Sequence, residues 1–416
     1  MMTKRKDGLL MRKCFALLKK CTAPLWLALA LVLALGLCAC SAPVTPAVSD
    51  STSESTTQTT TLPQTTEPPK PVRLRIAAVG DNLLHNTVSK DCLTDGGEYD
   101  YSKLYENLAP LLAGCDVAFI NEEVPLAGEI GAYPSLSAAG TVAQALRGAG
   151  FNVVNQASNH SLDKGQKGLL RSLDTLNETG FDAILGAFRT EEEANAQQII
   201  EKQGVRIGFL SYTYGLNGYS LPQDKPWLVS LIDNEKIKSD LAALRPNCDY
   251  LIVSMHWGNE YQTEPSDGQR TLAQMLADEG ADLIIGHHPH VLQPLEQLTA
   301  QDGREVTCVY SLGNYVSGQH KRATMLGGLL SVEVDVYPDG RRETAQAGVV
   351  PLVTHYEGKA ARYAVIPLDA YTEELAAVHG IKNFTDPVSL GYFDKLAQQV
   401  LGEARLTSEE LSSHEH

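Results

Sequence analysis

Short apolar runs alternate with segments of helical spacing along most of the chain, starting at about Val72. The first run, Val72–Gly80, alternates between apolar and polar residues, then becomes wholly apolar, as expected of a strand that enters a core. This period predicts strands at 72–80, 117–120, 151–155, 182–185, 205–212, 250–254, 283–285 and 306–310. Helices are predicted at 101–113, 141–149, 165–179, 235–244 and 268–279. Apolar strands that alternate with amphipathic helices predict an α/β fold whose sheet is covered by helices on both faces.

The pattern changes after Gly327. Strands predicted at 329–336, 347–355 and 362–368 have no long helix between them, so we expect them to form an antiparallel sheet. A last helix is predicted at 389–401. We therefore place one domain at 72–405 and a loose polar tail at 406–416.

The first forty residues are typical of a secretory signal peptide. A basic start is followed by an apolar run, Leu25–Leu37, that is short for a membrane span. The segment ends in Leu37-Cys38-Ala39-Cys40, which resembles a bacterial lipobox, in which Cys40 would become the lipidated first residue of the mature protein. An ordinary cleaved signal or an uncleaved anchor is the alternative. Two acyl chains on Cys40 would suffice for stable attachment to the cell membrane.

The segment that follows, residues 41–71, is rich in Ser, Thr and Pro and poor in large apolar residues. It cannot bury enough surface to offset the entropy of ordering it, so we expect a disordered tether. Together with Cys40, this predicts a protein that works on the extracytoplasmic face of the cell membrane.

Charge narrows the possible partners. Without the first forty residues, the chain has 27 basic against 49 acidic residues, a net charge of −22. Such a surface argues against nucleic acid as a partner and against general electrostatic capture of a polyanion. If the substrate is acidic, a local cation must hold it, and a bound metal would serve.

Candidate chemistry lies just after the predicted strands, where open α/β sheets place their ligand sites. Five groups occur there: Gly80-Asp81-Asn82, Asn121-Glu122-Glu123, the Asn159-His160 dyad with Asp163, Met255-His256, and His287-His288-Pro289-His290.

Each group alone has an ordinary explanation. An Asp can cap a turn, surface acids are common, and a loop histidine is often only solvated. Five such groups at successive strand ends make coincidence improbable. Carboxylate, amide and imidazole ligands form a mixed oxygen and nitrogen site, which suits Mn, Zn or Fe rather than a thiolate-selected metal.

Several longer motifs resemble those of the CapA-type proteins, a family associated with capsule and poly-γ-glutamate synthesis and related to the calcineurin-like metallophosphoesterases. The resemblance covers about 74–317 and rests on GDNLLH, NEEVPL, NQASNHSLDKGQKGLL, MHWGNEY, GHHPHVLQPLE and YSLGNY. It implies a four-layer α/β/β/α sandwich with a metal site at the strand ends.

The resemblance also implies roles for individual residues. The metal ligands it implies are Asp81, Asn121, Glu123, Asn159, His256, His288 and His290, holding one or two divalent ions. In the related phosphoesterases the Asn of the dyad binds metal, while its neighbour, here His160, stabilises the transition state or protonates the leaving group.

Two departures from the phosphoesterase pattern put a full two-metal centre in doubt. The Asp-x-His motif would require His at position 83, where this chain has Leu83, and the bridging Asp of the second motif appears as Glu or Asn. His287 could be a ligand or could hydrogen-bond Asp81 or Glu123 from a second shell.

Two functional hypotheses follow. The first is a metal-dependent hydrolase or transferase of the cell envelope, in which an activated water attacks a phosphoryl or acyl centre. His160 would then be the general acid, with Asp163 fixing its tautomer. The second is a non-catalytic component of the capsule synthesis and export machinery that binds the anionic polymer. If Glu123 and Asn121 do not reach the metal, the second hypothesis gains.

Overall fold

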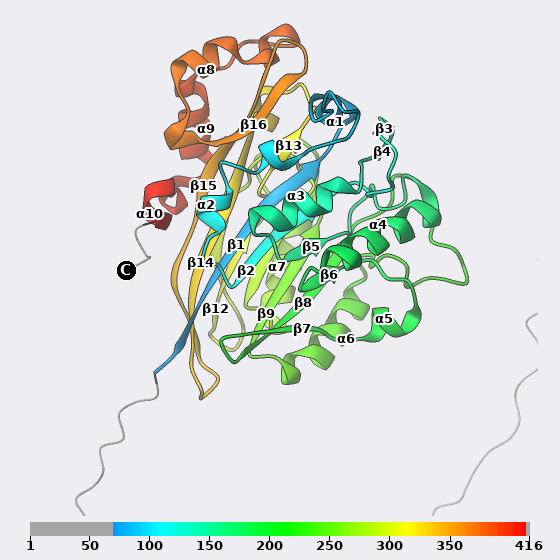
Figure 1. The fold of residues 1–416 in the computed structure, drawn as a ribbon. Helices are drawn as coiled ribbons and strands as arrows, with labels where there is room; N and C mark the ends of the chain where they lie inside the picture. The colour runs from blue at the N-terminus through cyan, green and yellow to red at the C-terminus, as the bar shows by residue number, and fades with distance from the viewer. Residues whose placement is uncertain (1–69, 413–416) are drawn as a thin grey trace, which may run out of the picture. The chain divides into compact units, whose positions relative to one another are not determined.

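The computed structural model describes residues 70–412 (Figure 1). The predicted signal peptide, Cys40 and the tether up to position 69 lie outside the described residues. No helix within 70–412 combines the length and the apolar character needed to cross a membrane.

The first of two large sheets has eight strands. Its order is β16 (Ala361–Pro367), β15 (Arg342–Glu357), β14 (Leu326–Val336), β1 (Val72–Leu83), β2 (Val117–Glu122), β5 (Val153–Asn155) and β6 (Ala183–Leu185), with β13 (Asn314–Ser317) paired to the end of β1. The strands from β1 to β6 are parallel, whereas β14, β15 and β16 are antiparallel.

The second sheet has six strands. Its order is β11 (Leu295–Thr299), β12 (Glu305–Val309), β10 (Leu283–His287), β9 (Tyr250–His256), β8 (Val205–Thr213) and β7 (Gln198–Lys202). The four central strands are parallel, and an antiparallel strand closes each edge. A separate small hairpin is formed by β3 (Gly131–Ala132) and β4 (Ser135–Ser137).

Side chains alternate between two cores, as they must in a strand with both faces covered. In β9, Ile252 joins the core between the sheets, whereas Leu251 and Val253 pack with side chains of α6 (Asn234–Leu244) and α7 (Asp267–Asp278). On the far side, Val142 and Leu146 of α3 (Thr141–Ala149) cover the first sheet.

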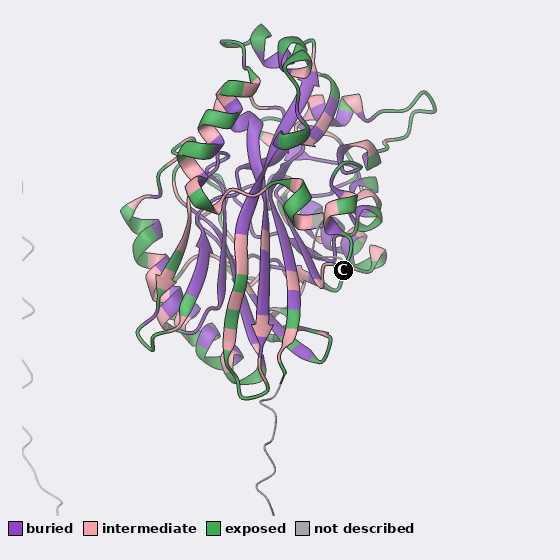
Figure 2. Cartoon of the chain, turned by 90° about the vertical axis from the view of Figure 1, so that its left-hand side faces the viewer, coloured by how far each residue is buried: buried purple, intermediate pink, exposed green. Residues whose placement is uncertain are grey.

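The layers are therefore helices, sheet, sheet and helices, and the predicted α/β sandwich is confirmed. Figure 2 shows buried strands inside and exposed outer helix faces. Six other helices lie on the first sheet or at its edges: α1 (Asn86–Asp91), α2 (Ala109–Leu112), α4 (Gly165–Thr179), α8 (Glu373–Val378), α9 (Leu390–Leu401) and α10 (Ser408–Ser412). The short helix α5 (Glu191–Asn195) lies near α6, at the edge of the second sheet.

Three expectations were wrong. The helix predicted at 101–113 is a 3-10 turn at Ser102–Leu104 followed by α2, because Pro110 cannot continue a helix but fits the first turn of a new one. The late antiparallel strands extend the first sheet through β14 and do not form a sheet of their own. The predicted loose tail includes α10, and the Leu406 N–H donates to Val349 O at 2.9 Å.

Candidate metal centre

Strand register brings the polar groups of the sequence into two rows. In the first sheet Asp81 of β1 lies beside Asn121 of β2, which lies beside Asn155 of β5. In the second sheet His256 of β9 lies beside His287 of β10. Parallel strands end at the same edge, so both rows lie at the same end of the sandwich, as an α/β ligand site requires.

Three side chains from three motifs converge most closely. Asp81, Glu123 and His290 each offer a ligand atom within 4.8 Å of the others, and all three are buried. The His290 Nδ1 lies 3.0 Å from Asp81 Oδ2 and 3.1 Å from Asn314 Oδ1. With these oxygens accepting, Nδ1 carries the hydrogen. Nε2, which lies 3.9 Å from Glu123 Oε1, is left free to bind an ion.

Asp81 is held by donors on several sides. The Asn121 amide donates to Asp81 Oδ1 at 2.8 Å, and the His288 backbone N–H approaches Oδ2 at 3.3 Å. Although burial alone would raise its pKa, hydrogen bonds from His287 and His290 hold the pKa of Asp81 well below its usual range. Asp81 is therefore a buried carboxylate that stays charged.

A chain of hydrogen bonds supports this carboxylate from behind. Ser211 donates to Asn155 Oδ1 at 2.5 Å, Asn155 donates to Asn121 Oδ1 at 2.7 Å, and Asn121 donates to Asp81. The amide of Asn121, which the sequence suggested as a ligand, thus has both its oxygen and its nitrogen bonded. It orients Asp81 in this arrangement.

The second-sheet side of the site is built by His256 and His288. The His256 Nε2 lies 2.7 Å from Asn159 Oδ1 and 3.6 Å from Glu123 Oε1. The rings of His256 and His288 lie 5.0 Å apart, and those of His288 and His290 lie 5.8 Å apart. His287 Nδ1 lies 3.5 Å from Asp81 Oδ1, so this histidine lies behind the carboxylate.

These residues fit a metal ion, because their buried polar atoms lack partners in the protein. Within 70–412, the buried atoms without a hydrogen bond include both carboxylate oxygens of Glu123, Nδ1 of His256 and Nδ1 of His288. Such orphaned groups are costly unless something satisfies them.

The protonation states agree with this fit. Burial lowers the pKa of His256 well below its usual value and that of His288 to about 3, so both imidazoles are neutral, as metal ligands must be. Burial and the charge of Asp81 raise the pKa of Glu123 well above its usual value. A bound cation would offset the repulsion between the charges of Asp81 and Glu123.

The neighbouring acid, Glu122, faces away from the site. Its Oε2 accepts from Asn82 Nδ2 at 2.6 Å, and the Tyr105 hydroxyl donates to Asn82 Oδ1 at 3.2 Å. Burial raises the pKa of Glu122 to about 8. Glu122 and Glu123 are therefore adjacent in sequence but opposed in space.

His160 and Asp163 lie at the edge of the cluster. The His160 Nδ1 is 2.7 Å from Asp163 Oδ2, and the Leu136 backbone N–H donates to the same oxygen at 2.7 Å. The carboxylate accepts, so Nδ1 of His160 carries the hydrogen and Nε2 is left for proton exchange. The amide of Asn217 joins the dyad, since it accepts from Asn159 Nδ2 at 2.9 Å and lies 3.2 Å from His160 Nδ1.

Sequence reasoning missed several residues at the site. Asn217 lies with Gly218 in an exposed turn and has a φ of 49°, for which the only signal was the Asn-Gly pair. Asn314 lay inside the quoted YSLGNY motif, but its contact with His290 depends on β13. That strand approaches β1 so closely that a Cβ at Gly80 would lie 1.9 Å from Gly313 O.

Two tyrosine rings and one lysine lie on the more exposed side of the site, which we call its mouth: Tyr214, Tyr261 and Lys321. The Tyr214 ring lies 4.5 Å from that of His288, and the Tyr261 ring lies 6.2 Å from that of His290. The Lys321 Nζ lies 3.7 Å over the Tyr261 ring, a cation–π arrangement that leaves its charge at the entrance. A positive charge therefore lies on the exposed side of the ring that neighbours His290.

Two packed sheets with helices outside form an α/β/β/α sandwich, and carboxylates, amides and imidazoles gather at its strand ends as a candidate metal site. The particular family is given by a family model for "Bacterial capsule synthesis protein PGA_cap", which matches residues 75–319. This match covers more than half of the chain, and the chain belongs to that family.

Curated relatives agree with this assignment. The capsule biosynthesis protein CapA of Bacillus anthracis is 30% identical over 306 residues, which cover 70% of this chain and 71% of that protein. The PGA biosynthesis protein CapA of Bacillus subtilis is 32% identical over 212 residues, covering 50% of this chain and 53% of that protein. The CapA-type resemblance of the sequence is confirmed.

Solved structures align with this chain at low sequence identity and low TM-score. The NAD nucleotidase of Haemophilus influenzae aligns over 83% of this chain and 60% of that chain, with 12% identity and a TM-score of 0.39. A purple acid phosphatase from yellow lupin aligns over 72% of this chain and 55% of that chain, with 11% identity and a TM-score of 0.35.

Proposed function

We propose that this capsule-synthesis protein is a metal-dependent hydrolase or transferase that acts on an anionic polymer of the cell envelope, with poly-γ-glutamate as the leading candidate. One observation carries the proposal: Asp81, Glu123 and His290 converge within 4.8 Å although they lie up to about two hundred residues apart in the sequence. Within the described residues, both oxygens of Glu123 lack a hydrogen-bond partner. The capsule context comes from the family and its relatives.

A divalent ion such as Mn, Zn or Fe would be held by Asp81, Glu123, His256, His288 and His290, with Asn159 beside them. When bound, such an ion supplies Lewis acidity and activates water. The chain's own residues do the rest. Asn121 and Asn155 hold Asp81 in place, while Tyr214 covers the rings of His256 and His288.

His160 is suited to proton transfer at its Nε2. Asp163 fixes the hydrogen on Nδ1, and the Asp163 carboxylate is itself held by the Leu136 N–H. A leaving group at the cluster would receive its proton from Nε2 of this ring. Lys321 would hold an acidic group of the substrate at the mouth.

A second candidate is a non-catalytic component that binds the polymer within the synthesis and export machinery. This candidate is favoured because the Asn121 amide donates to Asp81 and accepts from Asn155. With both ends bonded, Asn121 does not supply the metal ligand expected from the second motif. Turnover separates the two candidates, since both predict bound metal.

Substitutions at two adjacent residues, Glu123 and Glu122, test the proposed metal centre. Glu123→Gln removes a charge from the cluster, so bound metal, measured by mass spectrometry on the purified full chain, should fall by at least about tenfold. Glu122→Gln is the matched control: it is one residue away but faces Asn82, so metal content should stay at the wild-type level. Equal metal content in the two variants would remove Glu123 from the centre.

Activity is tested on the same samples. The wild type and Glu122→Gln should hydrolyse a phosphodiester or a γ-glutamyl probe, whereas Glu123→Gln should not. Full metal loading without turnover on either class of probe would favour the binding component instead.

A further inference from the structure

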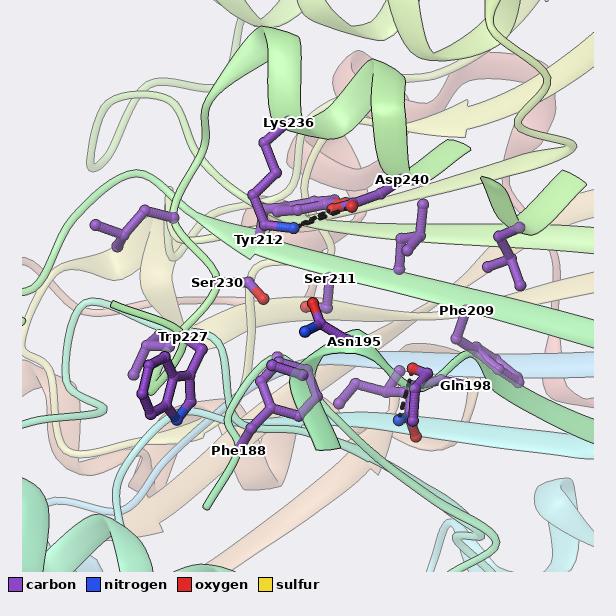
Figure 3. A pocket seen from close by; sticks show the side chains of 18 of the residues that line it. Phe188, Asn195, Gln198, Phe209, Ser211, Tyr212, Trp227, Ser230, Lys236 and Asp240 are labelled. Carbon is purple, nitrogen blue, oxygen red and sulfur yellow. Dashed lines mark hydrogen bonds and ion pairs between the residues drawn. The ribbon is translucent and has the colours of Figure 1, made fainter. Parts of the chain in front are cut away.

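A cavity lies beside β8, at the edge of the second sheet. Figure 3 shows the side chains that line it. Its volume is about 680 Å³, within the range of small-molecule sites. None of the residues of the metal centre lines it. The cavity exists because β7 pairs with β8 only as far as Phe209, which leaves the edge of Leu210–Tyr212 open between α5, α6 and the 221–233 loop.

Aromatic rings form much of its wall. Phe188 and Trp227 come from loops, while Phe209 and Tyr212 come from β8. The indole Nε1 of Trp227 is buried and has no hydrogen-bond partner among residues 70–412. Because a buried indole N–H normally finds an acceptor, this atom points to a ligand that supplies one.

Polar groups stand opposite the rings. Figure 3 shows the side-chain ends of Asn195, Ser211 and Ser230 turned toward a common space. Ser211 is anchored by its bond to Asn155, so its position is fixed. An amide and two hydroxyls beside aromatic faces can bind a molecule that has both hydroxyl groups and an apolar face.

The charges exclude an acidic ligand. The ammonium of Lys236 is bound to both oxygens of Asp240, at 3.0 and 2.8 Å, and the Tyr212 hydroxyl donates to the same carboxylate at 2.7 Å. Glu191 and Asp233 are the other charged residues of the wall. Three carboxylates with one fully engaged ammonium leave no cation free for an anion.

We propose that this cavity binds a short neutral oligosaccharide. A sugar ring places its apolar C–H face on an aromatic ring and its hydroxyls against amide and hydroxyl groups, which is the combination that Phe188, Trp227, Asn195 and Ser230 present. The cavity shares Ser211 with the hydrogen-bond chain behind Asp81, but the proposal does not rest on the reaction proposed at the metal centre.

The test is calorimetric titration of the purified full chain, in a detergent without a sugar headgroup, with maltotriose and chitotriose. At least one of these should bind. Trp227→Ala should weaken that binding by about tenfold or more, and Ser230→Ala by a few-fold, because they remove a stacking face and a hydroxyl. Melting temperatures confirm that both variants are folded, and Trp227→Phe should retain part of the affinity.

Tyr133→Ala is the matched control, since Tyr133 is exposed and lies outside this cavity. It should leave the affinity unchanged. The proposal is overturned if neither sugar binds, if Tyr133→Ala weakens binding as much as Trp227→Ala does, or if triglutamate or spermidine binds the cavity while both sugars fail.

Discussion

At the scale of single residues, we expect different roles for two histidines: His160 should transfer a proton, and His290 should bind the metal. His160 contacts Asp163 and Asn217 and lies at the edge of the cluster, whereas His290 lies within it. His160→Ala should therefore keep the metal and lower turnover by ~10²–10⁴. His290→Ala should lower metal content and turnover together. Mass spectrometry for metal and initial rates on one preparation measure both.

Asp163→Asn completes this series. It should give an intermediate rate, because an amide orients the imidazole less firmly than a carboxylate, and it should also loosen the Leu136 backbone contact. If His160→Ala keeps full activity and only melts earlier, His160 is a structural residue and the assignment as general acid is wrong.

We expect Lys321 to contribute to the binding of a charged substrate. It is exposed, its ammonium rests on the Tyr261 ring, and the chain after its first forty residues is strongly acidic. Lys321→Met should raise the KM for an acidic probe by about three- to tenfold, with little change in kcat or metal content. Lys359→Met, another exposed lysine, is the control. A KM ratio of one between the two variants would contradict a role in substrate binding.

At the scale of elements, the sequence predicted where the polar groups lie because their strands carry strong apolar patterns. Val117–Ile120 and Tyr250–Ser254 are buried on both faces, so the turns that follow them were visible as strand ends. The carboxyl ends of parallel strands then had to meet.

Other contacts of the site could not be predicted from the sequence. β13 is four residues long and lies between Gly313 and Gly318, so its pairing with β1 depends on a close backbone approach and has no periodic signal. The contact of Asn217 with His160 forms only when the two sheets pack. The turn that holds Tyr261, whose N–H donates to Pro289 O, joins the loops after β9 and β10. Tertiary packing decides these positions.

The C-terminal helices give a pH prediction of their own. His379 joins α8 to the following turn: its Nδ1 accepts from the Ile381 N–H at 3.0 Å, and its Nε2 lies 3.0 Å from Thr354 O. Burial, reinforced by nearby His355, lowers the pKa of His379 to about 4 from the ordinary 6.5. Protonation would place a second hydrogen against the Ile381 N–H, which the fold disfavours.

A histidine whose pKa is lower in the folded state stabilises the fold above pH 6.5 and loses that contribution as the pH falls toward 4. The loss through His379 between pH 7.5 and pH 5 is about 2 kcal/mol. His379→Gln should thus be less stable at pH 7.5 but lose less stability on acidification. Urea unfolding at both pH values measures this. Parallel losses in the two proteins would exclude His379 as the source.

At the scale of the whole molecule, two features matter for the predicted membrane attachment: the net charge of the chain and the distance along β1 between the start of the domain and the candidate metal centre. The chain enters the domain at Val72, whereas Asp81 lies nine residues further along β1, about 30 Å away in an extended strand. With 27 basic against 49 acidic residues after the first forty, the protein has no general attraction for an anionic lipid surface. We therefore predict that attachment to the membrane comes from a covalent lipid on Cys40.

Cys40→Ser should abolish incorporation of a clickable fatty acid and hinder processing of the leader, because a serine oxygen cannot replace the thioether. In the wild type, two acyl chains on Cys40 would provide stable anchoring at about 0.8 kcal/mol per buried methylene. Cys38→Ser, two residues away, is the matched control and should be labelled and retained like the wild type. Lipid labelling that persists in Cys40→Ser, or that disappears in Cys38→Ser instead, would show that Cys40 is not the attachment site.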